Sequence, residues 1–169
     1  MIQWQWSHFD QLSTQELYQV LRLRQAVFAV EQDCVYQDCD NADQQCWHLI
    51  GWSTAPAGEL PATEDTLTGR CIAAYLRVVP AGMKYPEIAI GRVVIADHAR
   101  SKGYGKQLME QGILQIERQW PKSAIRISAQ AHLQKFYGEL GFECVSPPYQ
   151  EDGIPHVEML RSPQSQKSS

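Results

Sequence analysis

The sequence predicts an α/β (α+β) fold in which a mixed β-sheet is flanked by helices. Three observations support this fold class. Apolar patterns typical of strands and of helices alternate along the chain, and a strand rich in β-branched residues is expected at Glu87–Ile95. This strand leads through a glycine-containing turn directly into a helix. With 169 residues the chain can form one domain, which we place at residues 1–161, followed by a flexible polar tail at 162–169.

The first half of the chain is expected to contain three strands, one helix and one flexible loop. The helix begins at the capping box Ser13-x-x-Glu16 and runs toward Phe28. The loop is rich in Thr, Ala, Pro and Gly, which favour a hairpin connection. In chain order, the expected elements are a strand at 2–7, the helix, a strand at 47–52, the loop at 53–69 and a strand at 70–79.

The second half combines the central strand with two helices and three further strands. Trp120-Pro121 should end the first of these helices, and Gly141 should cap the second in a left-handed conformation. In chain order, the expected elements are a strand at 87–95, the helix that Trp120-Pro121 ends, a strand at 124–129, a helix at 131–140, a strand at 142–145, a loop at 147–153 and a strand at 156–160.

The turn after the central strand has the features of a phosphate-binding loop. Gly103 and Gly105 allow a tight turn and a close approach of the backbone to a ligand. The free N–H groups of the loop and of the helix start point to one spot, where the helix dipole also favours an anion. Arg100, Lys102 and Lys106 add positive charge. A plain structural turn is the alternative, but this setting favours phosphate.

The glycine pattern also indicates which phosphate ligand binds. The P-loop motif GxxxxGK[ST] is absent, and GxGxxG fails because Leu108 occupies the third glycine position. Arg100-x-x-Gly103-x-Gly105 instead resembles the R/Q-x-x-G-x-G/A signature of the GNAT superfamily of acyltransferases. This resemblance implies acetyl-CoA as co-substrate, with its pyrophosphate on the loop. It also implies a mainly antiparallel sheet that splays between its fourth and fifth strands.

A second region strengthens the resemblance. Phe136, Tyr137 and the pair Gly141-Phe142 match the hydrophobic-Tyr-x-x-x-Gly-Phe pattern of GNAT enzymes, whereas Gln130 and Leu133 replace the usual Asn and Ala. From about Trp4 to Met159 the chain resembles the ElaA-like branch of this superfamily. The longest shared motifs are LRxxVFxVEQ at 23–32, GRV at 91–93, AQAHLQ at 129–134 and EDGIPH at 151–156.

The resemblance implies roles for particular residues. Tyr137 would be the general acid that protonates the departing CoA sulfur, although a helical tyrosine before a glycine cap is more commonly a core residue. The remaining implied contacts are to CoA, partly through backbone N–H groups of the central strand. The implied cofactor-binding set is Val93, Val94, Ile95, Arg100, Ser101, Lys102, Gly103, Tyr104, Gly105, Lys106, Gln130, Gln134 and Tyr137.

A protonated amine must lose a proton before it attacks a thioester, so a general base or a water chain is needed. Glu87 is a candidate because it shares strand parity with Val93 and Ile95. Glu31 could equally be a structural ion-pair partner, and the segment from Glu151 to His156 could be a salt-bridged loop. The candidate bases are therefore Glu31, Glu87, Glu151, Asp152 and His156.

Composition excludes several other classes of protein. A formal net charge of −4 disfavours a nucleic-acid-binding protein and suits an amine acceptor, either a small molecule or a peptide. We expect no transmembrane segment, no secretory signal and a reducing cytoplasmic location, given five cysteines. No metal is expected, because the cysteines and histidine of 34–48 lack paired CxxC spacing: Cys34, Cys39, Cys46 and His48. A non-catalytic acyl-CoA-binding or regulatory module remains the alternative to an N-acetyltransferase.

Overall fold

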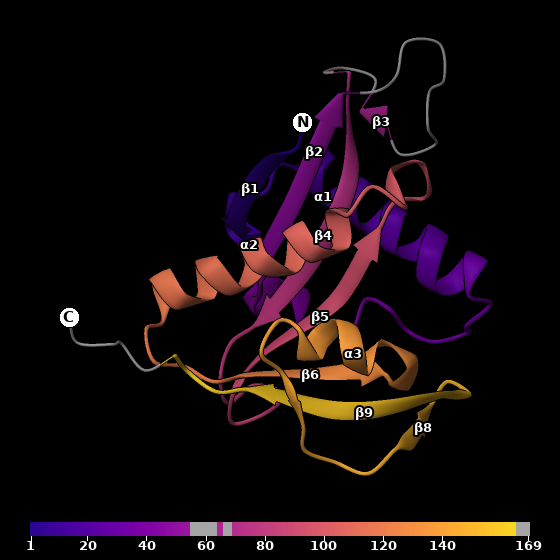
Figure 1. Cartoon of the computed structure of the whole chain (residues 1–169). Helices are drawn as coiled ribbons and strands as arrows, with labels where there is room; N and C mark the ends of the chain where they lie inside the picture. The colour runs from indigo at the N-terminus through magenta and orange to yellow at the C-terminus, as the bar shows by residue number, and fades with distance from the viewer. Residues whose placement is uncertain (55–63, 66–68, 165–169) are drawn as a thin grey trace.

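A computed structural model describes residues 1–54, 64–65 and 69–164. Its strands form one sheet in the order β1-β2-β4-β5-β6-β9-β7, with β3 beside β4 and β8 beside β9 (Figure 1). The strands of the described part are β1 Gln3–His8, β2 Trp47–Thr54, β3 Glu64–Asp65, β4 Arg70–Val79, β5 Ile88–Ile95, β6 Ile125–Gln130, β7 Glu143–Cys144, β8 Tyr149–Glu151 and β9 Ile154–Arg161.

The helices are short apart from α1 and α2. Ser13 and Glu16 form the expected reciprocal capping box at the start of α1. The α-helices are α1 Thr14–Arg24, α2 Tyr104–Gln119 and α3 Gln134–Gly138. A π-helix follows α1 at Gln25–Glu31, and 3-10 turns lie at Phe9–Gln11, Asp43–Gln45, Asp97–Ala99 and Ala131–Leu133.

The sheet is antiparallel except where β5 meets β6. These two strands pair in parallel at Ile88 with Ile125 and at Ala89 with Arg126, and beyond these pairs they diverge (Figure 1). When the two-residue β3 is left out, β5 and β6 are the fourth and fifth strands of the chain. The predicted fold class, including the splay between these strands, is therefore confirmed.

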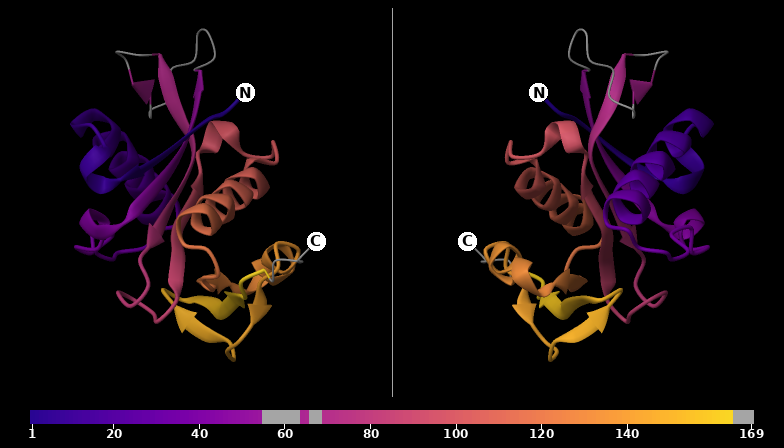
Figure 2. Two further views of the ribbon diagram at one scale, coloured as in Figure 1. Left: turned by 90° about the vertical axis from the view of Figure 1, so that its left-hand side faces the viewer. Right: turned by 90° about the vertical axis from the view of Figure 1, so that its right-hand side faces the viewer.

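The sheet is covered on both faces, as the continuous burial of β4 requires. Val20, Leu23 and Val27 pack on one face against residues such as Ile72 and Tyr75. On the opposite face α2 contributes a second cluster: Leu108, Met109, Ile113 and Ile116. Figure 2 shows α1 and α2 on opposite sides of the sheet.

A glycine lets α2 pack closely against the sheet. A Cβ atom at Gly112 would lie 2.9 Å from a methyl group of Leu76 in β4. Because real Cβ contacts essentially never come this close, a side chain at this position would displace the Leu76 side chain.

Three predicted elements differ from the structure. The helix after Ser13 changes to π-helical hydrogen bonding at Gln25, and the helix expected at 131–140 begins as a 3-10 turn and ends at Gly138. The expected loop at 147–153 contains β8, which forms a hairpin with β9. Its turn is Asp152-Gly153, where both residues have positive φ, as a tight hairpin turn requires.

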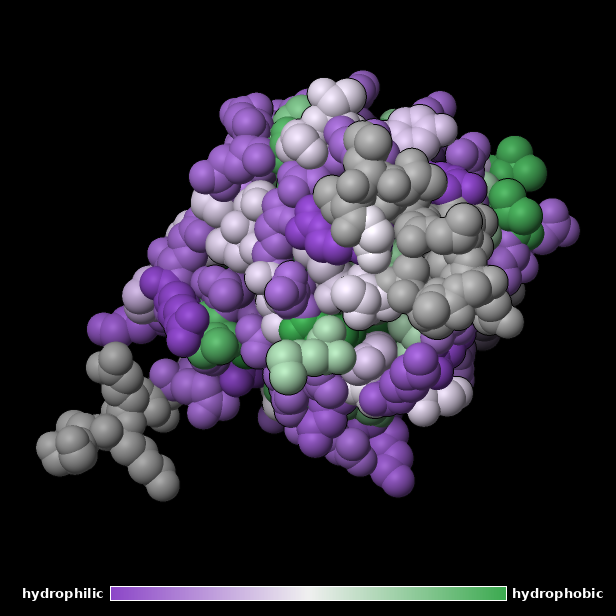
Figure 3. All heavy atoms as spheres, turned by 90° about the horizontal axis from the view of Figure 1, so that it is seen from above, coloured by the Kyte–Doolittle hydropathy of each residue, from purple (hydrophilic) through white to green (hydrophobic). Residues whose placement is uncertain are grey.

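Two expectations fall mainly outside the described residues. The expected hairpin loop at 53–69 includes 55–63 and 66–68, and the expected tail includes 165–169; none of these is described. The face of the molecule in Figure 3 is mainly hydrophilic, with small separate hydrophobic groups. Within the described part, no helix has the length and apolar character needed to cross a membrane.

Candidate active site

A β-bulge interrupts the pairing of β5 with β4 next to the splay. Arg77 pairs with Gly91, whereas Tyr75 pairs with Val94, so Arg92 and Val93 together lie opposite one residue of β4. Arg92 has a φ of 53°, which few residues other than glycine adopt. The bulge leaves the β5 backbone out of register with β4 at the place where β6 has already diverged.

The glycine turn joins the end of β5 to an uncapped helix start. Gly103 precedes α2 with a φ of 77°, and Ser101 has a φ of 62°. No side chain caps α2, and its first turn contains no acidic residue, in contrast to the capping box of α1. The first N–H groups of a helix have no intrahelical partner, so those of α2 can bind an external anion.

The basic residues of this turn differ in their surroundings. Arg100 forms a two-pronged ion pair with Glu31, at 2.6 Å from Nη1 to Oε1 and 2.9 Å from Nη2 to Oε2. Its Nε also donates to the carbonyl oxygen of Ile95. Lys102 and Lys106 are exposed. Arg100 therefore connects the turn to the π-helix, while the two lysines remain in solvent.

A cavity of about 490 Å³ lies where β5 and β6 diverge. Its walls come from β4, β5 and β6, from the β8–β9 hairpin, from α3 and from the segment after α1. The predicted site residues in its lining are Val93, Gln130, Tyr137, Glu151, Asp152 and His156. The others lie outside this lining: Glu31, Glu87, Val94, Ile95, Arg100, Ser101, Lys102, Gly103, Tyr104, Gly105, Lys106 and Gln134.

Tyr137 lies between the cavity and the core. It is 8% exposed, and its ring makes edge contacts with Phe136 and Phe142. Burial raises the pKa of Tyr137 to about 12. The hydroxyl group therefore keeps its proton at neutral pH and can donate it to a neighbouring sulfur atom.

The candidate bases fall into two groups. Arg126 binds Glu87 through Nε and Nη2, and these hydrogen bonds lower the pKa of Glu87. The hydrogen bonds from Arg100 lower the pKa of Glu31 in the same way. Both carboxylates lie outside the cavity lining and are paired with arginine, so neither is well placed to accept a proton from an amine.

Glu151, Asp152 and His156 form the second group, on the cavity wall made by the β8–β9 hairpin. Glu151 Oε2 accepts a hydrogen bond from Ser128 Oγ at 3.1 Å and lies 3.6 Å from His156 Nε2. His156 Nδ1 lies 2.7 Å from the carbonyl oxygen of Ile154. A backbone carbonyl can only accept, so Nδ1 carries a hydrogen and Nε2 of the neutral ring is left as an acceptor.

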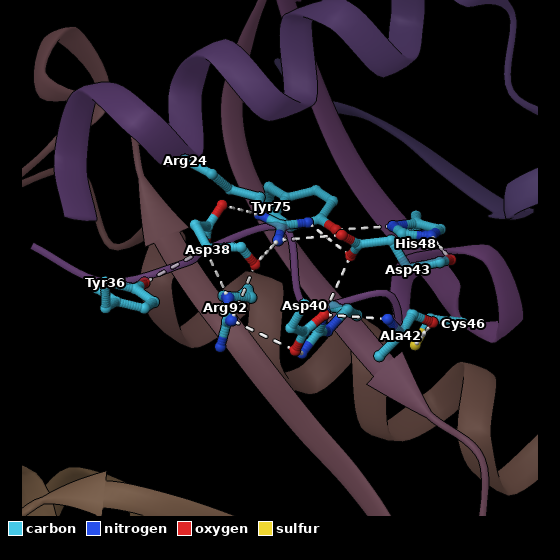
Figure 4. Close-up of polar contacts among 11 residues, drawn as sticks. Arg24, Tyr36, Asp38, Asp40, Ala42, Asp43, Cys46, His48, Tyr75 and Arg92 are labelled. Atoms are coloured by element: carbon cyan, nitrogen blue, oxygen red, sulfur yellow. Dashed lines mark hydrogen bonds and ion pairs between the residues drawn. The ribbon is translucent and has the colours of Figure 1, made fainter. Parts of the chain in front are cut away.

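A buried charge network, which the sequence did not reveal as a unit, borders the same cavity (Figure 4). It connects the segment after the π-helix to α1, β4 and β5. Arg24 and Arg77 are only 0% and 1% exposed. The network contains three arginines and three aspartates, so its charges balance: Arg24, Arg77, Arg92, Asp38, Asp40 and Asp43.

Each buried arginine of the network has two carboxylate partners. Arg24 donates from Nη1 to Asp43 at 2.7 Å and from Nε to Asp38 at 2.9 Å. Arg77 donates from Nη1 to Asp40 at 2.8 Å and to Asp43 at 3.0 Å. The signal in the sequence was an arginine inside the otherwise apolar strand at 70–79, together with three aspartates in one short loop.

The buried charge network should make stability depend on acid pH through Asp43. Burial alone would raise the pKa of Asp43, but its bonds to Arg24 and Arg77 hold the pKa below the ordinary value of 3.8. Its contribution is therefore present above about pH 4 and is lost as pH falls further. In urea titrations, Asp43→Asn should lower the free energy of unfolding most above pH 5. If the difference in free energy of unfolding between Asp43→Asn and the wild type stayed constant down to pH 3, this prediction would be wrong.

Of the candidate zinc ligands in the 34–48 segment, Cys46 and His48 make hydrogen bonds within the protein. His48 lies 2.7 Å from the Tyr75 hydroxyl through Nδ1 and 3.0 Å from the Asp43 carbonyl through Nε2. Cys46 is buried and donates to the carbonyl oxygen of Ala42. Among the described residues, no group of three or more His, Cys, Asp or Glu could hold a metal ion.

Comparison with known proteins defines the family to which this fold belongs. The acetyltransferase (GNAT) domain profile matches residues 70–162, which is more than half of the chain. The chain belongs to the GNAT family of acetyltransferases. It is 39% identical to protein ElaA of Escherichia coli over 163 residues, which covers 95% of this chain and 97% of ElaA. The resemblance to the ElaA-like branch is therefore confirmed.

Solved structures agree with this assignment. The crystal structure of Escherichia coli ElaA matches with a TM-score of 0.81 at 36% identity and covers 96% of this chain and 100% of that one. An acyl-CoA N-acyltransferase from Pseudomonas aeruginosa matches with a TM-score of 0.82 at 37% identity and the same coverage.

Proposed function

We propose that this protein transfers an acetyl group from acetyl-CoA to a primary amine of a small molecule or peptide. The observation that carries the proposal is the arrangement at the splay. Tyr137 and the edge of β5 that has no partner strand in the described part line the cavity, and the uncapped start of α2 lies beside them, since a Cβ atom at Gly105 would lie 3.9 Å from Phe136. The similarity to a protein described as an acyl-CoA N-acyltransferase supports the choice of a CoA thioester as donor.

The proposed donor position follows from the backbone. The pyrophosphate of CoA would bind to the N–H groups from Ser101 to Lys106, and the pantetheine would extend along β5 at Val93–Ile95. A backbone N–H of this edge would also stabilise the negative charge that develops on the thioester oxygen. The side chain of Val94 is buried against the α1 face of the sheet, so its contribution would come from the main chain alone.

The proposed reaction is a direct attack with two proton transfers. The amine loses a proton to Glu151 or His156, either directly or through water, and its lone pair then attacks the thioester carbon. As the carbon–sulfur bond breaks, the CoA thiolate takes the proton of the Tyr137 hydroxyl. The products are the N-acetyl amine and free CoA, and Tyr137 recovers a proton from solvent. No covalent enzyme intermediate is needed.

A screen for thiol release tests this proposal. Acetyl-CoA is offered with a panel of primary amines, and free CoA thiol and the N-acetyl product are both measured. Stoichiometric formation of both with at least one amine is the expected result. Binding of CoA without any transfer would instead favour the non-catalytic acyl-CoA-binding module.

Gly105→Glu should abolish CoA binding while leaving the fold intact. CoA binds the folded state, so it should raise the Tm of the wild-type protein. A Cβ atom at Gly105 would meet only Phe136, at an ordinary 3.9 Å, so the protein itself tolerates a side chain there. The added carboxylate would occupy and repel the pyrophosphate position. Gln107→Glu, which adds the same charge at an exposed site of α2, should keep most of the shift. If CoA raised the Tm of Gly105→Glu as much as that of the wild type, CoA would have to bind at another place.

A further inference from the structure

Arg92 presents an unused edge of its guanidinium group beside the cavity. Nε donates to Asp38 Oδ1 at 2.7 Å, and Nη2 donates to the Asp38 carbonyl oxygen at 3.1 Å and to Asp40 Oδ2 at 3.4 Å. Within the described part of the chain, Nη1 makes no such bond. In Figure 4, one terminal nitrogen of Arg92 points away from the aspartates. Two N–H donors of a cavity-lining residue are therefore open to a ligand.

The position of this edge is fixed by the protein itself. Arg92 is held by Asp38 and Asp40, its guanidinium carbon lies 5.6 Å from the centre of the Tyr36 ring, and its side chain is only 17% exposed. The bulge determines where the side chain leaves β5. A guanidinium held in place before the ligand arrives loses little conformational freedom on binding.

Charged side chains line two walls of the cavity. Arg77, Lys84 and Arg92 come from β4, β5 and the turn between them, with Asp40 paired to both arginines, whereas Glu151 and Asp152 come from the β8–β9 hairpin. Arg77 uses both terminal nitrogens for Asp40. Arg77 Nε also has no partner within the described residues, but that atom is fully buried, so the half-buried Arg92 is the arginine of this wall that can offer donors to a ligand. The acidic wall suits a protonated amine, and the Arg92 side suits an anion.

We propose that the acceptor is a small amine that also carries a carboxylate, an amino acid being the simplest case, and that Arg92 binds this carboxylate. The inference rests on the proposed function and names its substrate class. The amine would face Glu151 and His156, and the carboxylate would take the Nη1 donors of Arg92. Planar N–H donors on a guanidinium match carboxylate geometry better than a lysine ammonium does.

Matched acceptor pairs test the inference through turnover. Each amino acid is compared with its own carboxamide, which keeps the amine and side chain but removes the negative charge. The wild-type protein should prefer the carboxylate. Arg92→Met should raise KM for the carboxylate about 10- to 100-fold, the range expected for charge-assisted hydrogen bonds, and leave KM for the amide nearly unchanged. If Arg92→Met raised KM equally for the carboxylate and for its amide, Arg92 would be a structural residue and the inference would be overturned.

Arg126→Met is a matched control. Arg126 is 18% exposed, is paired with Glu87 and Glu158, and lies 5.4 Å from the centre of the Tyr85 ring, so its surroundings resemble those of Arg92. All three of its nitrogens are bonded, and it is outside the cavity lining. The Arg126→Met variant should therefore keep the preference for the carboxylate over the amide. If Arg92→Met does not fold, Arg92→Lys should retain the charge but lose part of the preference.

A binding measurement separates this inference from the proposed function. N-acetyl amino acids and their amides are titrated calorimetrically into the protein saturated with CoA. Tighter binding of the carboxylate form that disappears in Arg92→Met supports the inference even if no amine is acetylated, in which case only the proposed function fails. Acetylation of amines without any carboxylate preference in turnover or binding would overturn the inference and leave the proposed function standing.

Discussion

Replacing Tyr137 by Phe is expected to lower kcat about 100-fold while leaving the Kd for acetyl-CoA nearly unchanged. General-acid assistance is typically worth about 10²- to 10⁴-fold, and a CoA thiolate is a tolerable leaving group because an ordinary thiol pKa is about 8.5. The effect should therefore fall near the lower end of that range. The substitution removes only the hydroxyl group, so the ring contacts with Phe136 and Phe142 remain.

The measurement needs both kcat and an independent Kd. A loss confined to kcat would show that the lost interaction belongs to the transition state. Tyr18→Phe, at a tyrosine of α1 that is 63% exposed, controls for the loss of a hydroxyl group as such. Because the pKa of Tyr137 is about 12, ionisation of this residue should not limit the wild-type rate between pH 7 and 10. Unchanged kcat, with chemistry rate-limiting, would reduce Tyr137 to a packing residue.

Arg24→Met is expected to cause the largest loss of stability. Removing one partner of a buried ion pair costs about 3–5 kcal/mol, because the remaining charge is left without compensation. Here Asp43 keeps Arg77 and Asp38 keeps Arg92, so we expect a loss of about 3 kcal/mol. For a domain of this size that corresponds to a fall in Tm of roughly 6–12 °C.

The same substitution at a neighbouring position provides the control. Arg22 belongs to the same helix but is exposed, so Arg22→Met should change the free energy of unfolding by less than about 0.5 kcal/mol. Urea denaturation of both variants and the wild type measures the difference. Equal stability of the two variants would mean that the ion pairs merely balance the cost of burying their charges.

Much of the fold could be predicted from the sequence because its signals are local. The capping box of Ser13 and Glu16 joins residues three apart, and the β-branched run of β5 identifies a strand wherever it packs. The hairpin of β8 and β9 also carried a local signal, the Asp152-Gly153 pair, which the surrounding prolines obscured. The splay between β5 and β6 has no local signal, and it was predicted only because the glycine turn resembles the GNAT signature.

The remaining part of the site could not be predicted because it depends on contacts between distant residues. Arg92 and Asp38 are 54 positions apart in the sequence, and no local pattern pairs them. The left-handed backbone of Arg92 follows from its register against β4, not from its own preference. Sequence alone also could not show which candidate bases are already paired, because Arg100 and Arg126 bind Glu31 and Glu87 from distant elements.

The brief pairing of β5 with β6 also has a mechanical consequence. Only two residue pairs join the strands on either side, so the backbone ladder hardly connects residues 1–95 with the described residues 125–161. Side-chain contacts hold the two parts in alignment: the ion pair of Glu87 with Arg126 beside the two strand pairs, and the apolar cluster that includes Ile90, Ile127 and Tyr137. Apolar packing tolerates small sliding movements better than a continuous ladder of directional hydrogen bonds. The width of the cavity between β5 and β6 therefore depends more on side-chain packing than on backbone hydrogen bonds.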